Sequence, residues 1–286
     1  MNERELTFEE IALRHGSDKF RVHSFQKIYD RILTPRRHEP LRLLEIGVGG
    51  EGYAVGGSSL FAWRDYLPNA QIVGIDIYSK VEVDGDRIRT VVCDQSDPIA
   101  LNALNREHGP FDVIIDDGSH MGPHVAMSFH TLFPLLATRG TYVIEDIQTS
   151  YWPHYGGSSL APACFDTAVR WIKIAVDVIN RGEALDPTLF PASLGFDIAE
   201  LHVFHNIASF VKGDGSSDWR SRVLTEEARA AWLGHDRALH GDLSDAYQEL
   251  LADPGKLLRL LQVVSGAGGL DAFLALHARK SVALES

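Results

Sequence analysis

The sequence predicts an α/β protein with a doubly wound, mainly parallel sheet. Between Leu41 and Asp146, five short apolar runs alternate with stretches of helical length. Most of these runs are rich in Val and Ile at successive positions, as expected for strands that helices cover on both faces. Five such units in series favour parallel strands joined by helices. The predicted strands are LRLLEIGV (41–48), QIVGIDIY (71–78), IRTVVCD (88–94), FDVIIDD (111–117) and TYVIED (141–146).

Helices are expected before and between these strands. Two precede the first strand, over 6–14 and 22–33, and the polar sequence HGSDKF separates them. Three stretches of helical length follow, SSLFAWRDYL, DPIALNALNREHG and GPHVAMSFHTLFPLLATRG. Ser58, Asp97 and Gly140 are placed as start and stop signals for these helices.

Beyond the fifth strand, the sequence predicts a lid and a C-terminal extension. A segment rich in Gly, Pro and aromatics leads into a helix at about 166–181 and a Pro-containing loop. So long an excursion over the strand ends predicts a substrate lid. Two strand-like pieces with a turn near Asn206 are expected to finish the sheet as an antiparallel pair. The predicted parts are an N-terminal helical segment (1–40), an α/β domain (41–215, with its lid at about 151–198) and a helical extension (216–286).

The net charge and the cysteine content limit which kinds of partner and which cellular compartment are expected. The 286 residues include 27 Lys+Arg and 39 Asp+Glu, a formal net charge of −12. This charge disfavours nucleic acid and anionic membranes and favours a small neutral or cationic substrate. Cys93 and Cys164 fit no metal-binding spacing, so both are expected to be reduced and the protein cytoplasmic. No stretch approaches the ~20 apolar residues of a membrane span.

A glycine-rich turn follows the first predicted strand. Gly47, Gly49 and Gly52 satisfy G-x-G-x-x-G, which by itself suggests a dinucleotide site. However, Glu45 precedes the turn by two residues, and Gly52 does not lead directly into a helix. An acid beneath such a turn suits an amine-bearing ligand, such as the methionine end of S-adenosylmethionine (SAM). We expect Glu45, Gly47, Gly49 and Ser58 to bind this methyl donor.

Three further candidate residues lie at the ends of the second and third predicted strands. Asp76 is placed for a ribose diol, which both SAM and a dinucleotide carry. Asp94 and Gln95 are placed to hydrogen-bond an adenine amino group, although Asp94 also suits a turn or a cap. These positions extend the predicted donor site across the sheet.

Two acidic pairs end the fourth and fifth predicted strands, Asp116–Asp117 and Glu145–Asp146, and His120 follows the first pair by three residues. Adjacent strands lie ~4.8 Å apart, so these carboxylates can converge on one ion. Mg²⁺ prefers oxygen ligands, and a metal beside a neutral imidazole suits deprotonation of a hydroxyl. Asp116 is instead expected to lie near the donor or to accept hydrogen bonds from the turn.

Six segments resemble the metal-dependent class I SAM methyltransferases of Rossmann-like fold that act on deoxysugars of secondary metabolites, in particular the macrolide sugar O-methyltransferases. The resemblance is dense over about 10–155 and loose over 199–214, and DDGSH and EDIQTSYW are its most specific motifs. The segments are HGSDK (15–19), LLEIGVGG (43–50), GGSSLFAWRDYLPNAQIVGIDIY (56–78), GDRIRTVVCDQSD (85–97), FDVIIDDGSHM (111–121) and YVIEDIQTSYW (142–152).

The resemblance implies roles for the acidic pairs. Asp117, Glu145 and Asp146 are expected to bind Mg²⁺, and His120 to act as the general base. It also implies SAM as the donor, a glycoside as the substrate and a homo-oligomer. The acceptor remains open among a deoxysugar, an amino sugar, a catechol and another diol, and the less favoured alternative is a nicotinamide-dependent oxidoreductase.

Other residues near these motifs have two interpretations. Tyr151, Trp152 and Tyr155 suit either a sugar-binding surface or packing. Lys19 suits either the donor's carboxylate or an ion pair with an acid. His124, in the helix after His120, is expected to have a structural role.

Overall fold

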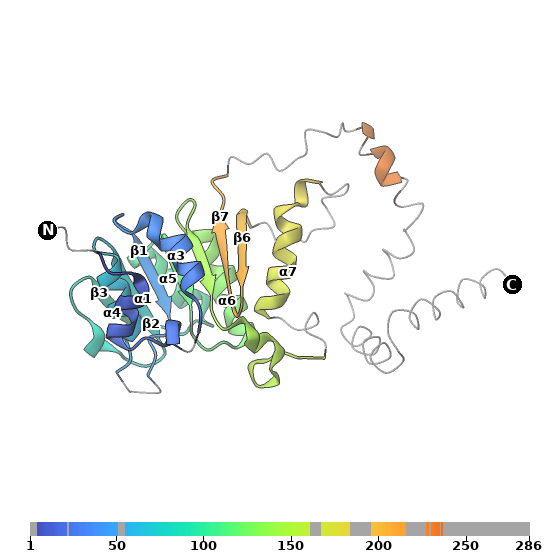
Figure 1. Ribbon diagram of the computed structural model, residues 1–286. Helices are drawn as coiled ribbons and strands as arrows, with labels where there is room; N and C mark the ends of the chain where they lie inside the picture. Colours follow the sequence, from blue (N-terminus) through green and yellow to red (C-terminus); the bar gives the residue numbers. More distant parts are fainter. Residues whose placement is uncertain are drawn as a thin grey trace. The chain divides into compact units, whose positions relative to one another are not determined.

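The computed structural model describes residues 5–21, 23–50, 55–160, 167–183, 196–215, 227–228, 230–234 and 236. The chain divides into two compact units, Met1–Ser221 and Arg222–Ser286. The first unit contains the α/β sheet (Figure 1). In the second unit, the described residues are helical. The predicted lid is described only in part, and its role stays a prediction.

The described residues form a seven-stranded sheet with the order β3-β2-β1-β4-β5-β7-β6. The first five strands are parallel, and β7 pairs antiparallel with both β5 and β6. This arrangement confirms the predicted fold class and the antiparallel pair, which turns at Asn206 with a φ of 64°. The strands are β1 (Arg42–Ile46), β2 (Gln71–Asp76), β3 (Ile88–Val92), β4 (Val113–Asp116), β5 (Thr141–Ile144), β6 (Ile198–Phe204) and β7 (Ile207–Lys212).

Helices flank the sheet (Figure 1). The α-helices are α1 (Phe8–His15), α2 (Asp18–Arg21), α3 (Gln26–Leu33), α4 (Ser58–Tyr66), α5 (Pro98–His108), α6 (Gly122–Leu132) and α7 (Ala168–Ile179). The 3₁₀ turns are η1 (Thr34–Arg36), η2 (Val81–Val83), η3 (Phe133–Leu135), η4 (Ile147–Tyr151), η5 (Pro153–Tyr155) and η7 (Arg181–Glu183).

The observed helix boundaries confirm two predicted helix starts and correct two other predictions, a helix end and a break between helices. Asp97 caps α5, since its Oδ1 accepts hydrogen bonds from two backbone N–H groups of the first turn. Helix α4 begins at Ser58 as predicted. Gly140 does not end the preceding helix, because α6 stops at Leu132 and η3 contains Pro134, which lacks an N–H. The sequence HGSDKF (15–20), predicted as a polar break, contains most of the short helix α2, which starts at Asp18 and ends at Arg21.

Two apolar clusters hold the helices against opposite faces of the sheet. Leu44 and Ile114 belong to the cluster that also contains side chains of α5, α6 and α7. Their strand neighbours Leu43 and Val113 belong to the cluster with α1, α3 and α4. Neighbouring residues on a strand point to opposite faces, so successive apolar residues give both faces a core.

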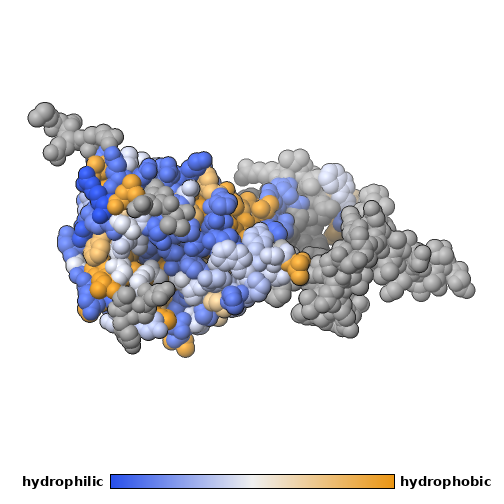
Figure 2. Space-filling view, turned by 60° about the horizontal axis from the view of Figure 1, so that its bottom comes forward, coloured by the Kyte–Doolittle hydropathy of each residue, from blue (hydrophilic) through white to orange (hydrophobic). Residues whose placement is uncertain are grey.

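The described surface is largely hydrophilic. Figure 2 shows polar side chains over most of the visible face, with apolar ones scattered among them. Among the described residues, no helix has the length and apolar character to cross a membrane.

Phe129 lies at the centre of the α5–α7 cluster and gives a test of this core. It is 2% exposed, and its ring lies 4.8–5.1 Å from the rings of Phe133, Tyr142 and Phe210. We expect Phe129→Ala to lower the free energy of unfolding by about 3–5 kcal/mol, because it leaves a cavity. Chemical denaturation measures the loss. Ile99→Ala is the control, since Ile99 is 79% exposed; an equal effect of both substitutions would contradict this packing.

Candidate active site

A cleft of about 360 Å³ opens beyond the carboxyl ends of the parallel strands. Ligands of doubly wound sheets bind at this edge. Six of the predicted site residues line it, namely Gly47, Gly49, Asp76, Asp94, Gln95 and Asp117. The wall also includes Tyr78, Ser119 and His124, for which the sequence analysis gave no donor role. The motif DDGSH could have pointed to this part of the wall, because Ser119 lies within it. The Ser119 Oγ is in turn 3.0 Å from Nδ1 of His124.

The glycine turn lets two loops approach closely. Gly47 has a φ of +91°, and a Cβ at this position would lie 2.2 Å from the carbonyl oxygen of Asp117. Only glycine fits there, because the neighbouring atom belongs to the backbone. Gly49 also has a positive φ, of +73°, and faces open space. Gly52, the third glycine of the motif, lies outside the described residues.

The polar residues of the cleft wall are held in place by the backbone. Asp76 accepts hydrogen bonds from the N–H groups of Val48 and Tyr78, at 3.3 and 2.9 Å. The backbone N–H of Ser96 donates to Asp94 at 2.8 Å and, with the Ser96 hydroxyl, lowers the pKa of this carboxyl. Asp94 thus has the turn role that the sequence left open. Its predicted contact with adenine stays a prediction.

Three residues predicted to bind the donor do not line the cleft. Glu45 is fully buried and accepts a hydrogen bond from the Trp63 indole at 2.9 Å. Asp116 is 1% exposed and accepts hydrogen bonds from Ser128, Tyr142 and Gln95. Burial raises the pKa of both carboxyls. Ser58 begins α4 and is likewise not in the cleft wall.

Lys19 lies among three acidic side chains beneath the cleft. Its Nζ is 2.8 Å from Asp117, 2.8 Å from Glu145 and 3.2 Å from Glu45, and the side chain is 1% exposed. Of its two predicted roles, the structure shows the ion pair. Burial would lower the pKa of Lys19, but these three acids outweigh it and raise the pKa well above its usual value. The three acids thus favour the charged form of Lys19.

Glu145 is shared between this cation and Tyr29. Both of its oxygens accept hydrogen bonds from Lys19, and Oε1 also accepts one from the Tyr29 hydroxyl. Burial and the nearby Asp117 raise the pKa of Glu145, while Lys19 opposes the rise. Because each carboxylate oxygen has about two acceptor positions, Oε2 keeps one for a further partner.

Asp117, His120 and Asp146 form a cluster at the end of the cleft. Each offers one ligand atom, and these atoms lie within 4.8 Å of one another. The His120 Nε2 is 3.9 Å from Asp117 and 3.7 Å from Asp146, and all three side chains are partly exposed. Two carboxylates that face a partly open space fit Mg²⁺, which takes oxygen ligands and retains water or substrate. The cluster thus has the donor set of a magnesium site.

Two residues of this cluster have strained backbones. His120 and Asp146 have φ values of 56° and 50°, in the left-handed region that residues other than glycine rarely adopt. Such conformations cost of order 1–3 kcal/mol and concentrate at functional sites. The strain marks both turns as candidate functional positions.

The predicted aromatic residues lie beside the cluster. The Tyr155 ring lies 6.3 Å from the His120 ring and 6.0 Å from the Trp152 ring, centroid to centroid. Trp152 is 48% exposed and Tyr151 40%. A flat apolar surface beside His120 suits a ring-shaped acceptor.

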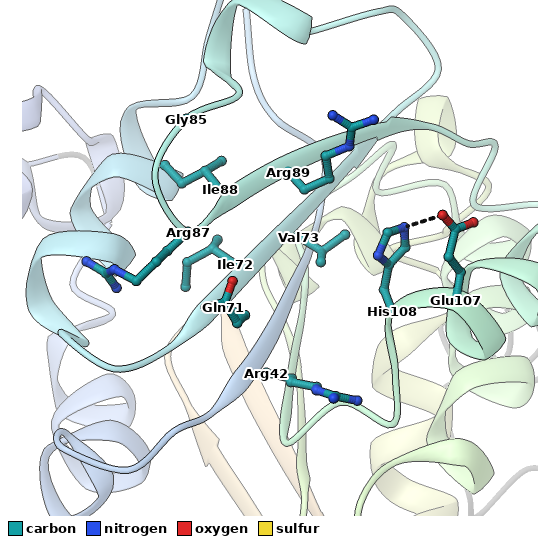
Figure 3. A pocket seen from close by; sticks show the side chains of 10 residues that line it. All are labelled: Arg42, Gln71, Ile72, Val73, Gly85, Arg87, Ile88, Arg89, Glu107 and His108. Carbon is teal, nitrogen blue, oxygen red and sulfur yellow. Dashed lines mark ion pairs between the residues drawn. The ribbon is translucent and has the colours of Figure 1, made fainter.

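A second cleft, of about 290 Å³, lies where β1, β2 and β3 begin, at the opposite end of the strands from the first cleft. Figure 3 shows the side chains that line it. Its guanidinium groups point in different directions, and each binds other protein groups. Arg87 donates to three backbone carbonyls, Arg42 to that of Gly109, and Arg89 to Asp84. This cleft lacks the convergent polar groups of the first.

Comparisons with known proteins agree with this geometry, although no family model matches the chain. The chain is 42% identical over 207 residues to mycinamicin VI 2''-O-methyltransferase of Micromonospora griseorubida, covering 71% of this chain and 52% of that protein. It is 41% identical over 214 residues to demethylmacrocin O-methyltransferase of Streptomyces fradiae, covering 74% and 53%. The chain thus spans about half the length of these curated relatives.

A solved structure shows the same fold. The mycinamycin-pathway methyltransferase MycE, in complex with Mg and S-adenosylhomocysteine (SAH), is 39% identical with a TM-score of 0.70, covering 80% of this chain and 59% of that chain. The fold is therefore the α/β Rossmann-like methyltransferase fold. More particularly, the chain is a relative of the macrolide and polyketide deoxysugar O-methyltransferases, which confirms the predicted resemblance.

The ion pairs of Lys19 give a test of stability. We expect Lys19→Met to lower the free energy of unfolding by about 3–5 kcal/mol, because it leaves buried acids without their cation. Lys27→Met, at an exposed position of α3, is the control and should change it by less than about 0.5 kcal/mol. Chemical denaturation of both variants measures the difference, and a stable Lys19→Met protein would refute the interaction.

Cys93, which lines the 360 Å³ cleft, gives a test of the cleft wall. Burial, with help from Asp97 and Asp94, raises the pKa of its thiol to about 11. Since only the thiolate reacts, we expect slow alkylation at pH 8 and a steep increase as the pH approaches 11. Peptide-resolved mass spectrometry after iodoacetamide treatment separates Cys93 from Cys164. Rapid labelling of Cys93 at pH 7 would contradict this environment.

Proposed function

We propose that this protein transfers a methyl group from SAM to a hydroxyl of a deoxysugar on a glycosylated natural product, in a Mg²⁺-dependent reaction. The observation that carries the proposal is Asp117, which lines the donor cleft and also belongs to the cluster with His120 and Asp146. A donor site and a metal site therefore share one wall. The relatives named above are methyltransferases, which favours SAM over a dinucleotide.

Different residues of the site have different proposed roles. The turn at Gly47 and Gly49, with Asp76, would bind the donor. Asp117 and Asp146 would hold Mg²⁺. Glu145, the third predicted ligand, lies outside their cluster and binds Lys19, so its part in the metal site stays a prediction. When bound, Mg²⁺ supplies Lewis-acid chemistry that lowers the pKa of a coordinated hydroxyl. The aromatic residues Tyr151, Trp152 and Tyr155 would orient the sugar.

His120 would complete the reaction as the general base. Its Nε2 lies beside both proposed metal ligands, so it can take the proton of the hydroxyl there. The oxygen then attacks the methyl group on the sulfonium of SAM, the carbon–sulfur bond breaks, and SAH leaves. The substrate glycoside, a homo-oligomer and a cytoplasmic location belong to the same proposal.

The proposal is tested with labelled SAM, a panel of deoxysugar glycosides and catechols, and either Mg²⁺ or EDTA. Transfer to a glycoside that EDTA stops and Mg²⁺ restores is the expected result. Transfer to a catechol or an amino sugar alone would replace the acceptor class. Transfer that EDTA does not affect would refute the metal site.

His120→Ala tests the proposed base. We expect turnover to fall by about 10²–10⁴-fold, because the hydroxyl loses its proton acceptor, while the dissociation constant of SAH, measured by calorimetry, stays within about twofold. His38→Ala is the control, since the His38 side chain is 61% exposed. If His120→Ala weakened SAH binding as much as turnover, His120 would have a structural role instead.

A further inference from the structure

A second histidine lies at the proposed metal site. His23, in the segment between α2 and α3, places its Nδ1 3.4 Å from Oδ1 of Asp146. The two residues are far apart in the sequence, and no motif of the sequence analysis contained His23. The N-terminal segment therefore reaches the strand ends through Lys19 and also, independently, through His23.

Each oxygen of Asp146 has its own neighbours. Oδ1 faces His23 and accepts a hydrogen bond from the Gln148 side chain at 3.0 Å. Oδ2 faces His120 at 3.7 Å. His23 thus contacts the oxygen away from the proposed base, and Oδ2 faces the cluster with Asp117.

The His23 ring is held by packing. It stacks on the ring of the buried Phe25, with 4.8 Å between centroids and 17° between planes. The side chain is still 23% exposed, so it lies at the edge of the site rather than in the core. A ring fixed by stacking can hold a carboxylate that has its own backbone in the strained left-handed region.

We propose that His23 is a positioning residue, which orients the Asp146 carboxylate towards Mg²⁺. The inference rests on the proposed function, because it assumes that Asp146 binds the metal. Carboxylates that bind metals are themselves oriented by neighbouring polar groups, here the His23 ring at 3.4 Å, and loss of such groups typically costs about 10–100-fold in metal affinity. His23 and His120 flank the same acid at different oxygens: His23 lies at Oδ1 and His120, the proposed base, at Oδ2.

Two variants test the proposal in the full chain. His23→Ala removes the contact, whereas His23→Asn retains an N–H donor near the Nδ1 position. Titration of Mg²⁺ alone by calorimetry should show a dissociation constant about 10-fold or more higher for His23→Ala. The dissociation constant of His23→Asn should lie within about threefold of the wild-type value, and that of the control His38→Ala should equal the wild-type value. Turnover of His23→Ala should fall at limiting Mg²⁺ and recover at saturating Mg²⁺.

The outcomes separate this inference from the proposed function. If the wild-type protein does not bind Mg²⁺, the proposed metal site fails and the role of His23 fails with it. If the wild type binds Mg²⁺ and His23→Ala binds it equally well, only the positioning role is overturned. If saturating Mg²⁺ does not restore turnover of His23→Ala, His23 acts on the proton or the substrate, which also overturns it.

Discussion

The ion pairs of Lys19 are the interaction on which the site depends. One ammonium group contacts Glu45, Asp117 and Glu145, and thereby ties the N-terminal helices to the ends of β1, β4 and β5. Burying an unpaired charge costs several kcal/mol, so neither the acids nor Lys19 would be stable there without the other. Tyr29 of α3 adds a hydrogen bond to Glu145 and strengthens the same connection.

The acids around the internal cation differ in burial. Glu45 and Glu145 are buried and contact Lys19. Asp117 is partly exposed and lies between Lys19, at its Oδ2, and His120, at its Oδ1. Asp146 is also partly exposed and faces His120. One positive charge inside the fold balances the buried acids, while the partly exposed Asp117 and Asp146 would bind a divalent ion in the proposed site. The cleft reaches the same place through Asp117, so in the proposed site the donor and the metal would lie side by side.

Much of the fold followed from the sequence, because apolar runs and helical stretches alternate over the first five strands. Placing Asp76, Asp94 and Asp117 at the strand ends required only the rule that parallel strands share a carboxyl edge. The directions of Glu45 and Asp116 were not predictable in this way, since an acid at a strand end can point into the cleft or into the packed layers. Contacts such as Lys19 to Glu145 join distant parts of the chain, and no local pattern encodes them.

The most direct test of a magnesium site between Asp117 and Asp146 is a crystal structure with Mn²⁺ and SAH, read by the anomalous scattering of the metal. We predict one strong peak within coordination distance of both carboxylates, beside His120 and next to SAH in the cleft. The Lys19 ammonium should still contact Glu45 and Glu145. A peak elsewhere, or SAH bound in the cleft with no metal near Asp117 and Asp146, would contradict the proposed division of the site.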